Sequence, residues 1–250
     1  MRESASWHAR FTDAATRLAA RPDPDWSRGT ALSPAVAASL ATFQIGESGD
    51  GAHLLDQADA TGDAEYAAAV RLFVAEEENH ARLLAELLSA AGYDVLQRHW
   101  TEVSFVWVRR MLGLRTELMV LTIAEVIALR YYRALAEGTD DALLGEVATR
   151  ILDDERRHVP FQVHRLRAEF ACSPVALRLV ARHLWRMAAL VVTVVVAVDH
   201  GPALRDLRVG RREFVADTRR LFAPVVADVF SRRPRRGVSD DDPRDRRTIA

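Results

Sequence analysis

The stretches Glu76-Glu77-Glu78-Asn79-His80 and Asp154-Glu155-Arg156-Arg157-His158 each place a glutamate and a histidine three positions apart. Residues at this separation lie on the same face of an α-helix. Both pairs interrupt an apolar stripe with alternating steps of three and four, the pattern of a helix that faces a bundle core. The two stripes read Tyr66, Val70, Phe73, Glu77, His80, Leu84, Leu87 and Leu144, Ala148, Ile151, Glu155, His158, Gln162.

Two other predicted helices carry one glutamate each within their apolar stripe. These stripes read Leu40, Phe43, Glu47, Leu54 and Leu114, Leu118, Leu121, Glu125, Ala128, Tyr132, Leu135. Alternating strand patterns are nearly absent from the chain, so we predict an all-α protein. Its four long helices are expected at about 33–59, 63–91, 111–137 and 140–170.

The four glutamates are predicted to lie at one level of the bundle. Glu47 and Glu77 are each 15 residues from the turn residue Gly62, and the second pair of glutamates is placed in the same way about Asp140. In an antiparallel hairpin, residues at equal distances from the turn lie side by side, here roughly 22 Å from it at ~1.5 Å rise per residue.

A buried layer of four carboxylates needs positive charge. Burying even one unpaired carboxylate costs several kcal/mol, and four together also repel one another. The chain has no lysine, and no arginine lies on these stripes at that level. Two divalent cations would neutralise the layer, and four carboxylates with two imidazoles suit iron or manganese better than zinc or copper. The predicted metal ligands are Glu47, Glu77, His80, Glu125, Glu155 and His158.

This order of ligands resembles that of the ferritin-like di-iron carboxylate proteins. The resemblance covers roughly residues 33–170 and includes all six ligand positions. The second motif is similar to the acidic-Glu-x-Arg-His form of oxygen-activating members, whereas Asn79 stands where the first motif would have arginine. The resemblance implies a four-helix bundle with a long crossover between its second and third helices, and the segment 92–110 is long enough for it.

Several residues near the predicted ligands have a possible supporting role. Asp154 and Glu76 each precede a ligand glutamate, and each either hydrogen-bonds a ligand histidine of a neighbouring helix or is an ordinary flanking charge. Tyr132 lies two turns after Glu125 and either relays electrons or packs in the core. Glu78, Glu117 and Glu146 lie off the stripes and are expected to be solvated, Tyr131 to point outward, and His53, His164, His183 and His200 to be structural or surface residues. No catalytic residue beyond the ligands is assigned.

The rest of the chain is predicted to complete one domain over residues 1–230. An amphipathic helix is expected near 3–20, and two accessory helices are expected at about 174–200 and 211–230. The first accessory helix is apolar on several faces, which predicts that it covers the bundle, closes an apolar pocket or forms a homodimer interface. The charged segment 231–250 is expected to be disordered.

Composition excludes several classes of protein. The 250 residues include 34 arginines against 35 acidic residues, so the net charge of −1 gives no case for nucleic acid binding. Cys172 is the single cysteine, which excludes an internal disulfide and a cysteine-built metal site. The longest apolar run, 187–198, is short for a membrane span, and residues 1–11 do not resemble a signal peptide. We expect a cytoplasmic protein.

Four functions are compatible with the predicted site. The favoured one is an oxidase or oxygenase whose two iron ions (or manganese, or one of each) activate O₂ to oxidise a small apolar organic molecule, with an external electron donor. The second is a ferroxidase or iron store, although the last 80 residues have no place in a storage shell. The third is peroxide removal that resembles rubrerythrin or manganese catalase. The fourth is a non-catalytic metal-binding or partner-binding protein.

Overall fold

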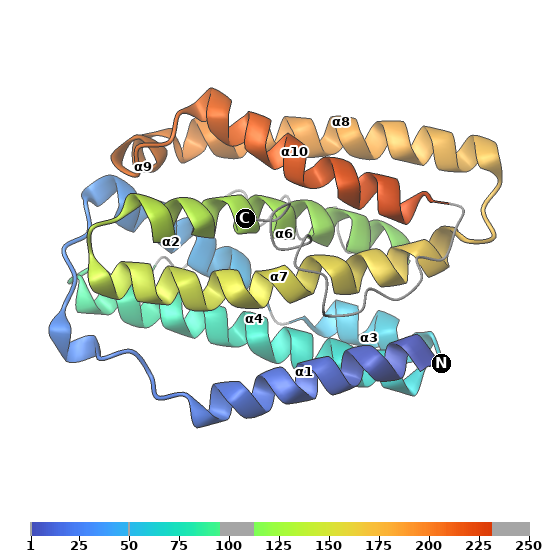
Figure 1. Cartoon of the computed structure of the whole chain (residues 1–250), viewed down its shortest axis with the longest axis horizontal. Helices are drawn as coiled ribbons and strands as arrows, with labels where there is room; N and C mark the ends of the chain where they lie inside the picture. The colour runs from blue at the N-terminus through green and yellow to red at the C-terminus, as the bar shows by residue number, and fades with distance from the viewer. Residues whose placement is uncertain (1, 50, 96–112, 232–250) are drawn as a thin grey trace, which may run out of the picture.

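The computed structural model describes residues 2–49, 51–95 and 113–231 (Figure 1). Within these ranges the chain is helical and contains no strand, as predicted. The helices are α1 (Arg2–Ala20), the short 3-10 helix η1 (Trp26–Arg28), α2 (Pro34–Glu47), α3 (Ala52–Ala60), α4 (Ala64–Ala90), α6 (Gly113–Gly138), α7 (Ala142–Phe170), α8 (Val175–Asp199), α9 (Gly201–Asp206) and α10 (Arg211–Val229).

Two helical hairpins form the centre of the molecule. The turns at 61–63 and 139–141 reverse the chain between α3 and α4 and between α6 and α7. Each turn ends in an aspartate that caps the next helix, because Asp63 accepts a hydrogen bond from the Tyr66 N–H and Asp141 accepts one from the Leu144 N–H. Helix α4 packs against α2, α3 and α7. The predicted long crossover and charged tail fall largely on 96–112 and 232–250, outside the described residues.

The first bundle helix is broken, and the prediction of one helix over 33–59 was wrong. Helix α2 ends at Glu47, and α3 starts after Gly51. Gly51 has a φ of 59°, in the left-handed region that favours glycine, and a Cβ there would lie 2.6 Å from Cγ1 of Val74. The chain therefore turns where α4 passes closest, and this turn places Glu47 at the C-terminal end of a helix, facing the bundle centre.

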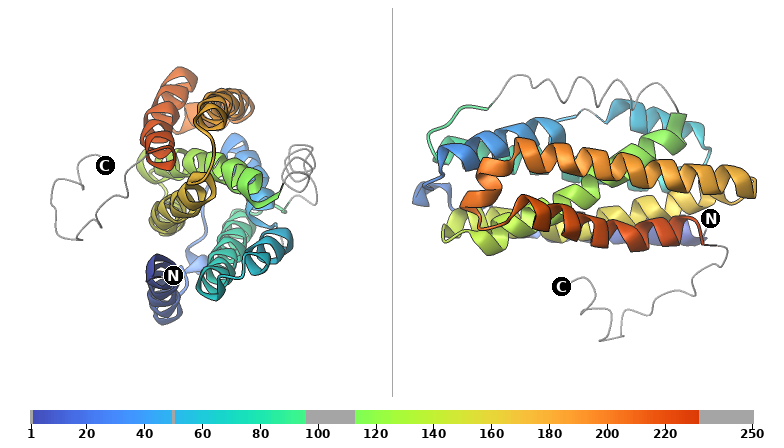
Figure 2. Two further views of the ribbon diagram at one scale, coloured as in Figure 1. Left: turned by 90° about the vertical axis from the view of Figure 1, so that its right-hand side faces the viewer. Right: turned by 90° about the horizontal axis from the view of Figure 1, so that it is seen from above.

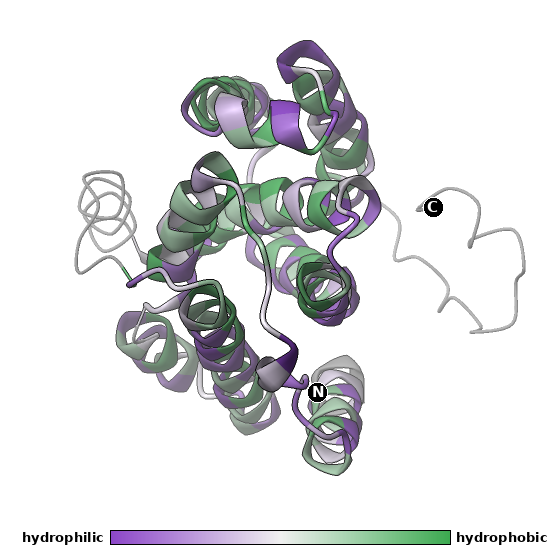
Figure 3. Ribbon diagram, turned by 90° about the vertical axis from the view of Figure 1, so that its left-hand side faces the viewer, coloured by the Kyte–Doolittle hydropathy of each residue, from purple (hydrophilic) through white to green (hydrophobic). Residues whose placement is uncertain are grey.

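The remaining helices form outer layers on opposite sides of the bundle. Helix α1 packs against α4, while α8 and α10 lie side by side over α6 and α7 (Figure 2). Trp185 of α8 is buried, and its indole N–H donates to the Met119 carbonyl of α6 at 2.8 Å. Apolar and polar residues share the circumference of most helices (Figure 3), as expected where one face packs inward.

The break at Gly51 can be tested against its neighbour Gly46. Gly51→Ala is expected to lower the free energy of unfolding by about 1–2 kcal/mol or more, because the new Cβ meets Val74 and the backbone is left-handed. Gly46→Ala lies within α2 with nothing near its Cβ, and should raise that free energy by up to ~1 kcal/mol. Urea unfolding of the metal-free variants measures both changes. Equal effects of the two substitutions would contradict this account of the break.

Candidate metal centre

All six predicted ligands converge in the middle of the bundle. They form two groups of four, and within each group the potential ligand atoms lie within 4.8 Å of one another. The first group is Glu47, Glu77, His80 and Glu155, and the second is Glu77, Glu125, Glu155 and His158. Glu77 and Glu155 belong to both groups. If each group held one metal ion, these two shared carboxylates would contact both ions.

Four helices supply these side chains to a nearly dry layer. Glu47 comes from α2, Glu125 from α6, and one Glu-x-x-His pair each from α4 and α7. His80, His158 and Glu155 have no exposed surface, and Glu77 is the most open of the six, with 18% of its side chain exposed. The four carboxylates thus lie together where water cannot screen them.

The two histidines point the same ring nitrogen at the carboxylates. His158 Nδ1 lies 2.9 Å from Glu77 Oε1, and His80 Nδ1 lies 3.5 Å from Glu155 Oε1. The Nε2 atoms face away from the cluster, toward Asp154 Oδ2 at 3.2 Å for His80 and toward Glu76 Oε2 at 2.9 Å for His158. Asp154 and Glu76 therefore each contact the histidine of the opposite helix, which is the first of the two roles that the sequence allows. An Nε2–H donated to a carboxylate leaves the Nδ1 lone pair free for a metal ion.

Arg157 joins the two supporting carboxylates. Its Nη2 donates to Glu76 Oε1 at 3.0 Å and also to Asp154 Oδ1. Sequence analysis did not assign this role, although Arg157 occupies the arginine position of the acidic-Glu-x-Arg-His motif. One guanidinium thus holds both acids that orient the ligand histidines.

Several atoms of the cluster are buried without a hydrogen-bond partner. Among the described residues these include Glu77 Oε1, His80 Nδ1, both carboxylate oxygens of Glu155, and His158 Nδ1. His158 Nδ1 and Glu77 Oε1 are close, yet their contact does not have hydrogen-bond geometry. Unpartnered buried acceptors are costly, and atoms arranged around a common centre are what a bound cation satisfies. The donor set therefore fits the iron or manganese pair expected from the sequence.

Neutral donors hold the two carboxylates that the groups do not share. Tyr132 donates its hydroxyl hydrogen to Glu47 Oε1 at 2.7 Å, and Gln162 donates from Nε2 to Glu125 Oε1 at 2.8 Å. Tyr132 was predicted either to pack or to relay electrons, and the structure places it in direct contact with a ligand. Glu47 and Glu125 are thus each held by one hydrogen bond from an uncharged side chain.

Aromatic residues close the side of the cluster that faces α1. Phe11 of α1 lies alongside His158 with ring centroids 6.2 Å apart, and Phe73 of α4 meets the same ring edge-on at 4.7 Å. Both phenylalanines are buried. The N-terminal helix therefore helps to exclude water from the second ligand group.

Burial and mutual repulsion shift the proton affinities of the cluster. Burial, followed by the charge of Glu77, raises the pKa of Glu47 well above its usual range, and burial together with Glu125 raises the pKa of Glu155. Burial alone would lower the pKa values of His80 and His158, but the surrounding carboxylates raise both well above the ordinary value. Without metal, the cluster therefore holds protons at neutral pH.

Two expectations about α6 were wrong. Glu117 is fully buried and lies 2.8 Å from His53 Nδ1, although it was expected to be solvated. Tyr131 is also fully buried, and its hydroxyl lies 2.6 Å from Ser39 Oγ, which in turn lies 2.7 Å from His200 Nδ1. Helix α6 contacts α3, α7, α8 and α10, so it has several buried faces rather than the single face that its apolar stripe indicates.

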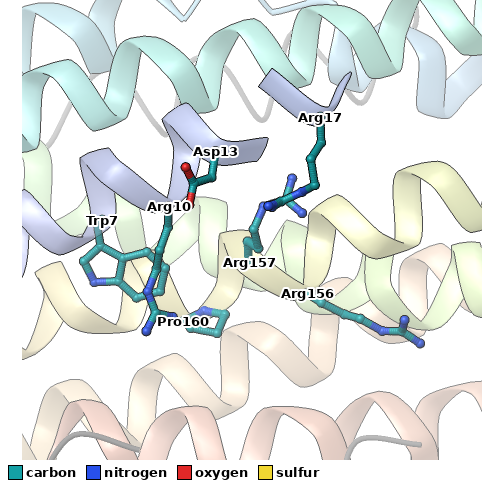
Figure 4. Close-up of a pocket in the computed structure, with 7 residues that line it drawn as sticks. All are labelled: Trp7, Arg10, Asp13, Arg17, Arg156, Arg157 and Pro160. Atoms are coloured by element: carbon teal, nitrogen blue, oxygen red, sulfur yellow. The ribbon is translucent and has the colours of Figure 1, made fainter. Parts of the chain in front are cut away.

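Arginine-rich pockets lie outside the cluster, between α1 and α7. One has a volume of about 210 Å³, and four arginines and one aspartate line it together with Trp7 and Pro160 (Figure 4). A neighbouring pocket of about 250 Å³ is lined by five arginines and three aspartates. Arg157 borders both pockets, and none of the six ligands lines either of them. The surface nearest to Arg157 is therefore positively charged.

No model of a known protein family matches the chain, and no curated protein is significantly similar to it. The structure itself shows an all-α bundle with a buried carboxylate–histidine cluster that could hold metal ions.

Metal binding is expected to release protons. Because the pKa values of His80, His158 and Glu47 are raised, these groups keep their protons to higher pH than usual in the metal-free chain, and an entering cation competes with those protons. The apparent affinity for Mn²⁺ should therefore increase as the pH rises. Calorimetric titration in two buffers of different ionisation enthalpy measures the protons released. A binding heat that does not depend on the buffer would contradict the prediction.

Arg157 is expected to matter for metal affinity although it is not a ligand. Arg157→Gln frees Asp154 and Glu76, so that neither histidine is held in place, and the affinity for Mn²⁺ should fall about 10–100-fold. Competition with a chelator of known affinity measures this change. The matched control is Arg156→Gln, because Arg156 is exposed and pairs with Asp153 instead. A similar loss in both variants would mean that Arg157 acts only through general charge.

Proposed function

We propose that this protein is a ferritin-like dinuclear-metal oxidoreductase that holds two iron ions and uses O₂ to oxidise a small organic molecule. The observation that carries the proposal is the pair of ligand groups that share Glu77 and Glu155. The supply of these ligands from α2, α4, α6 and α7, in the order Glu, Glu-x-x-His, Glu, Glu-x-x-His, supports the ferritin-like arrangement.

When bound, the two ions supply the coordination positions and electrons for O₂ reduction. The protein holds the ligand atoms before the metal arrives, because Asp154, Glu76, Tyr132 and Gln162 restrain four of the six ligand side chains. Phe11 and Phe73 keep water from one side of the cluster. Tyr132 keeps its own hydroxyl proton and donates it in a hydrogen bond to Glu47 Oε1, so this tyrosine is placed to pass a proton or an electron to the centre. Complete reduction of O₂ takes four electrons, of which two ferrous ions would supply two and the oxidised substrate the other two, and an external electron donor would then return the ions to the ferrous state.

The charge of the two pockets gives no support for iron traffic. A path for Fe²⁺ needs a negative lining, whereas both pockets beside Arg157 carry more arginines than aspartates. The many apolar residues of α8 do not support an apolar substrate pocket, because most of their large side chains are exposed on the outside of the molecule. Iron oxidation or peroxide removal at the same centre are the alternatives that the experiment below separates.

The shared and unshared ligands predict different metal contents. Glu77→Ala removes a ligand from both groups and should abolish stable binding of both ions. Glu47→Ala or Glu125→Ala removes a ligand from one group only and should leave about one ion per chain, against two in the unmodified protein. The control is Glu78→Ala, because Glu78 is exposed next to Glu77. Mass spectrometry of protein loaded anaerobically with iron measures the content. Full loading of Glu77→Ala would contradict a dinuclear site at these residues.

The reaction with O₂ separates the proposed function from its alternatives. Stopped-flow mixing of the ferrous protein with O₂ should show a transient visible absorption band and consumption of O₂ that depends on an added reductant. Continuous turnover of Fe²⁺ to released ferric iron would indicate a ferroxidase instead. Activity with hydrogen peroxide in a manganese-loaded protein that is inert to O₂ would indicate a catalase. Two bound ions without either reaction would leave a structural site.

A further inference from the structure

Helix α8 presents a long apolar face to the outside of the molecule. Its buried side consists of Trp185, Ala189, Thr193 and Ala197, which follow one another at four-residue steps against the bundle. Ten large apolar side chains of α8 nevertheless have 42–61% of their surface exposed, and these are Val175, Leu177, Leu179, Val180, Leu184, Met187, Val191, Val194, Val195 and Val198. Isolated apolar residues on a surface are ordinary, but a continuous set on one helix indicates an interaction site.

Seven of these exposed residues follow a heptad pattern. Leu177, Val180, Leu184, Met187, Val191, Val194 and Val198 are separated by alternating steps of three and four. We call this set the outer seam. Three heptads of such spacing place side chains along one line of the helix, where they interlock with the side chains of a second helix. Helix α8 therefore has two apolar lines, one used within the chain and one left open.

The outer seam is also the width of one helix rather than a broad face. Helix α10 packs beside α8 and covers one flank of it (Figure 2). By length and composition alone, α8 qualifies as a membrane span, with 17% of its apolar window buried. Its packing against α6, α9 and α10, and the hydrogen bond of Trp185 to α6, hold it to the bundle instead. A helix that its own chain holds in this way fits a protein partner better than a bilayer.

We propose that the outer seam binds the outer seam of a second copy of this chain, with the two α8 helices antiparallel about a two-fold axis. An axis near residue 189 pairs Val180 with Val198, Leu184 with Val194, and Met187 with Val191, so every pair combines the two kinds of heptad position. The small residues Ala181 and Ala188 lie next to the seam and let the helices approach closely.

The helix dipole favours the antiparallel direction. Antiparallel pairing places the C-terminal end of one α8 beside the N-terminal half of the other, which is favourable for the two dipoles. The arginines Arg178, Arg182 and Arg186 take no part in this pairing, because each stands seven residues before a buried residue and lies on the bundle side of the helix.

The exposed apolar area of the seam is of the size that a dimer needs. Its seven side chains, each about half exposed, amount to on the order of 600 Å², which is most of the roughly 800 Å² that one partner contributes to a standard protein interface. This inference does not depend on the metal centre, so its test is independent of the proposed function.

Sedimentation equilibrium of the full chain tests the interface. The unmodified protein should be a dimer at micromolar concentration, and the double variant Leu184→Glu/Val191→Glu should be a monomer with the same helical content by circular dichroism. Leu179→Glu is the matched control, because Leu179 is 59% exposed on α8 but lies outside the seam. It should remain a dimer. A monomeric unmodified protein, or a dimer that survives the double substitution, would overturn the proposal.

Cross-linking tests the direction of pairing. In a Cys172→Ser background, which removes the exposed native thiol, Leu184→Cys/Val194→Cys should form a disulfide between chains on mild oxidation. Leu184→Cys alone should do so only in a parallel pair, and that result would overturn the antiparallel arrangement. Flotation with vesicles of phosphatidylserine and phosphatidylcholine is the third measurement. A monomer that floats with the vesicles would assign the seam to a membrane surface and overturn the dimer.

Discussion

The burial of four carboxylates at one level of a helical bundle is the constraint on which the rest of this structure depends. Glu47, Glu77, Glu125 and Glu155 repel one another in a layer that water scarcely reaches. Burying an isolated carboxylate costs several kcal/mol of folding free energy. Removing one partner from a buried charged cluster costs more than the repulsion it relieves, because the charges of the other members are left uncompensated. Protons reduce the repulsion in the metal-free chain, and two divalent cations would remove it.

The surroundings of the cluster alternate in charge from the centre outward. The carboxylates contact His80 and His158, the histidines contact Asp154 and Glu76, and Arg157 contacts both of these acids. Each layer can be buried because the next one compensates it, and each hydrogen bond fixes the orientation of the layer inside it. The arginine-lined pockets lie at the outer end of this series, where Arg157 borders both of them. The orientation of the ligand histidines is therefore set in part by a residue, Arg157, that does not touch them.

The outer helices exclude water from the bundle and form part of its exposed surface. Helix α1 brings Phe11 against a ligand histidine, and α8 and α10 cover α6, the helix that carries Glu125. Covering one bundle face requires only one side of α8. The folding of a single chain does not explain the outer seam on the other side of α8. This is the reason for the proposal that a second copy of the chain binds there.

Much of the fold and nearly all of the candidate centre could be predicted from the sequence, because both depend on regular local spacing. Helix periodicity identified the bundle helices, and equal distances from two turns identified four glutamates at one level. The two Glu-x-x-His pairs then completed the ligand set, and the acids next to them were candidates to support the histidines. Such patterns are readable because residues three or four apart share a helix face whatever the rest of the chain does.

The tertiary structure alone decided what lies against each helix. Only the approach of Val74 shows why the chain breaks at Gly51, and only the packing of several helices around α6 buries Glu117 and Tyr131. The bridge made by Arg157 and the outward direction of the seam on α8 depend in the same way on neighbours distant in sequence. A stripe in the sequence reports one buried face of a helix, whereas the number of buried faces is set by how many other elements pack around it.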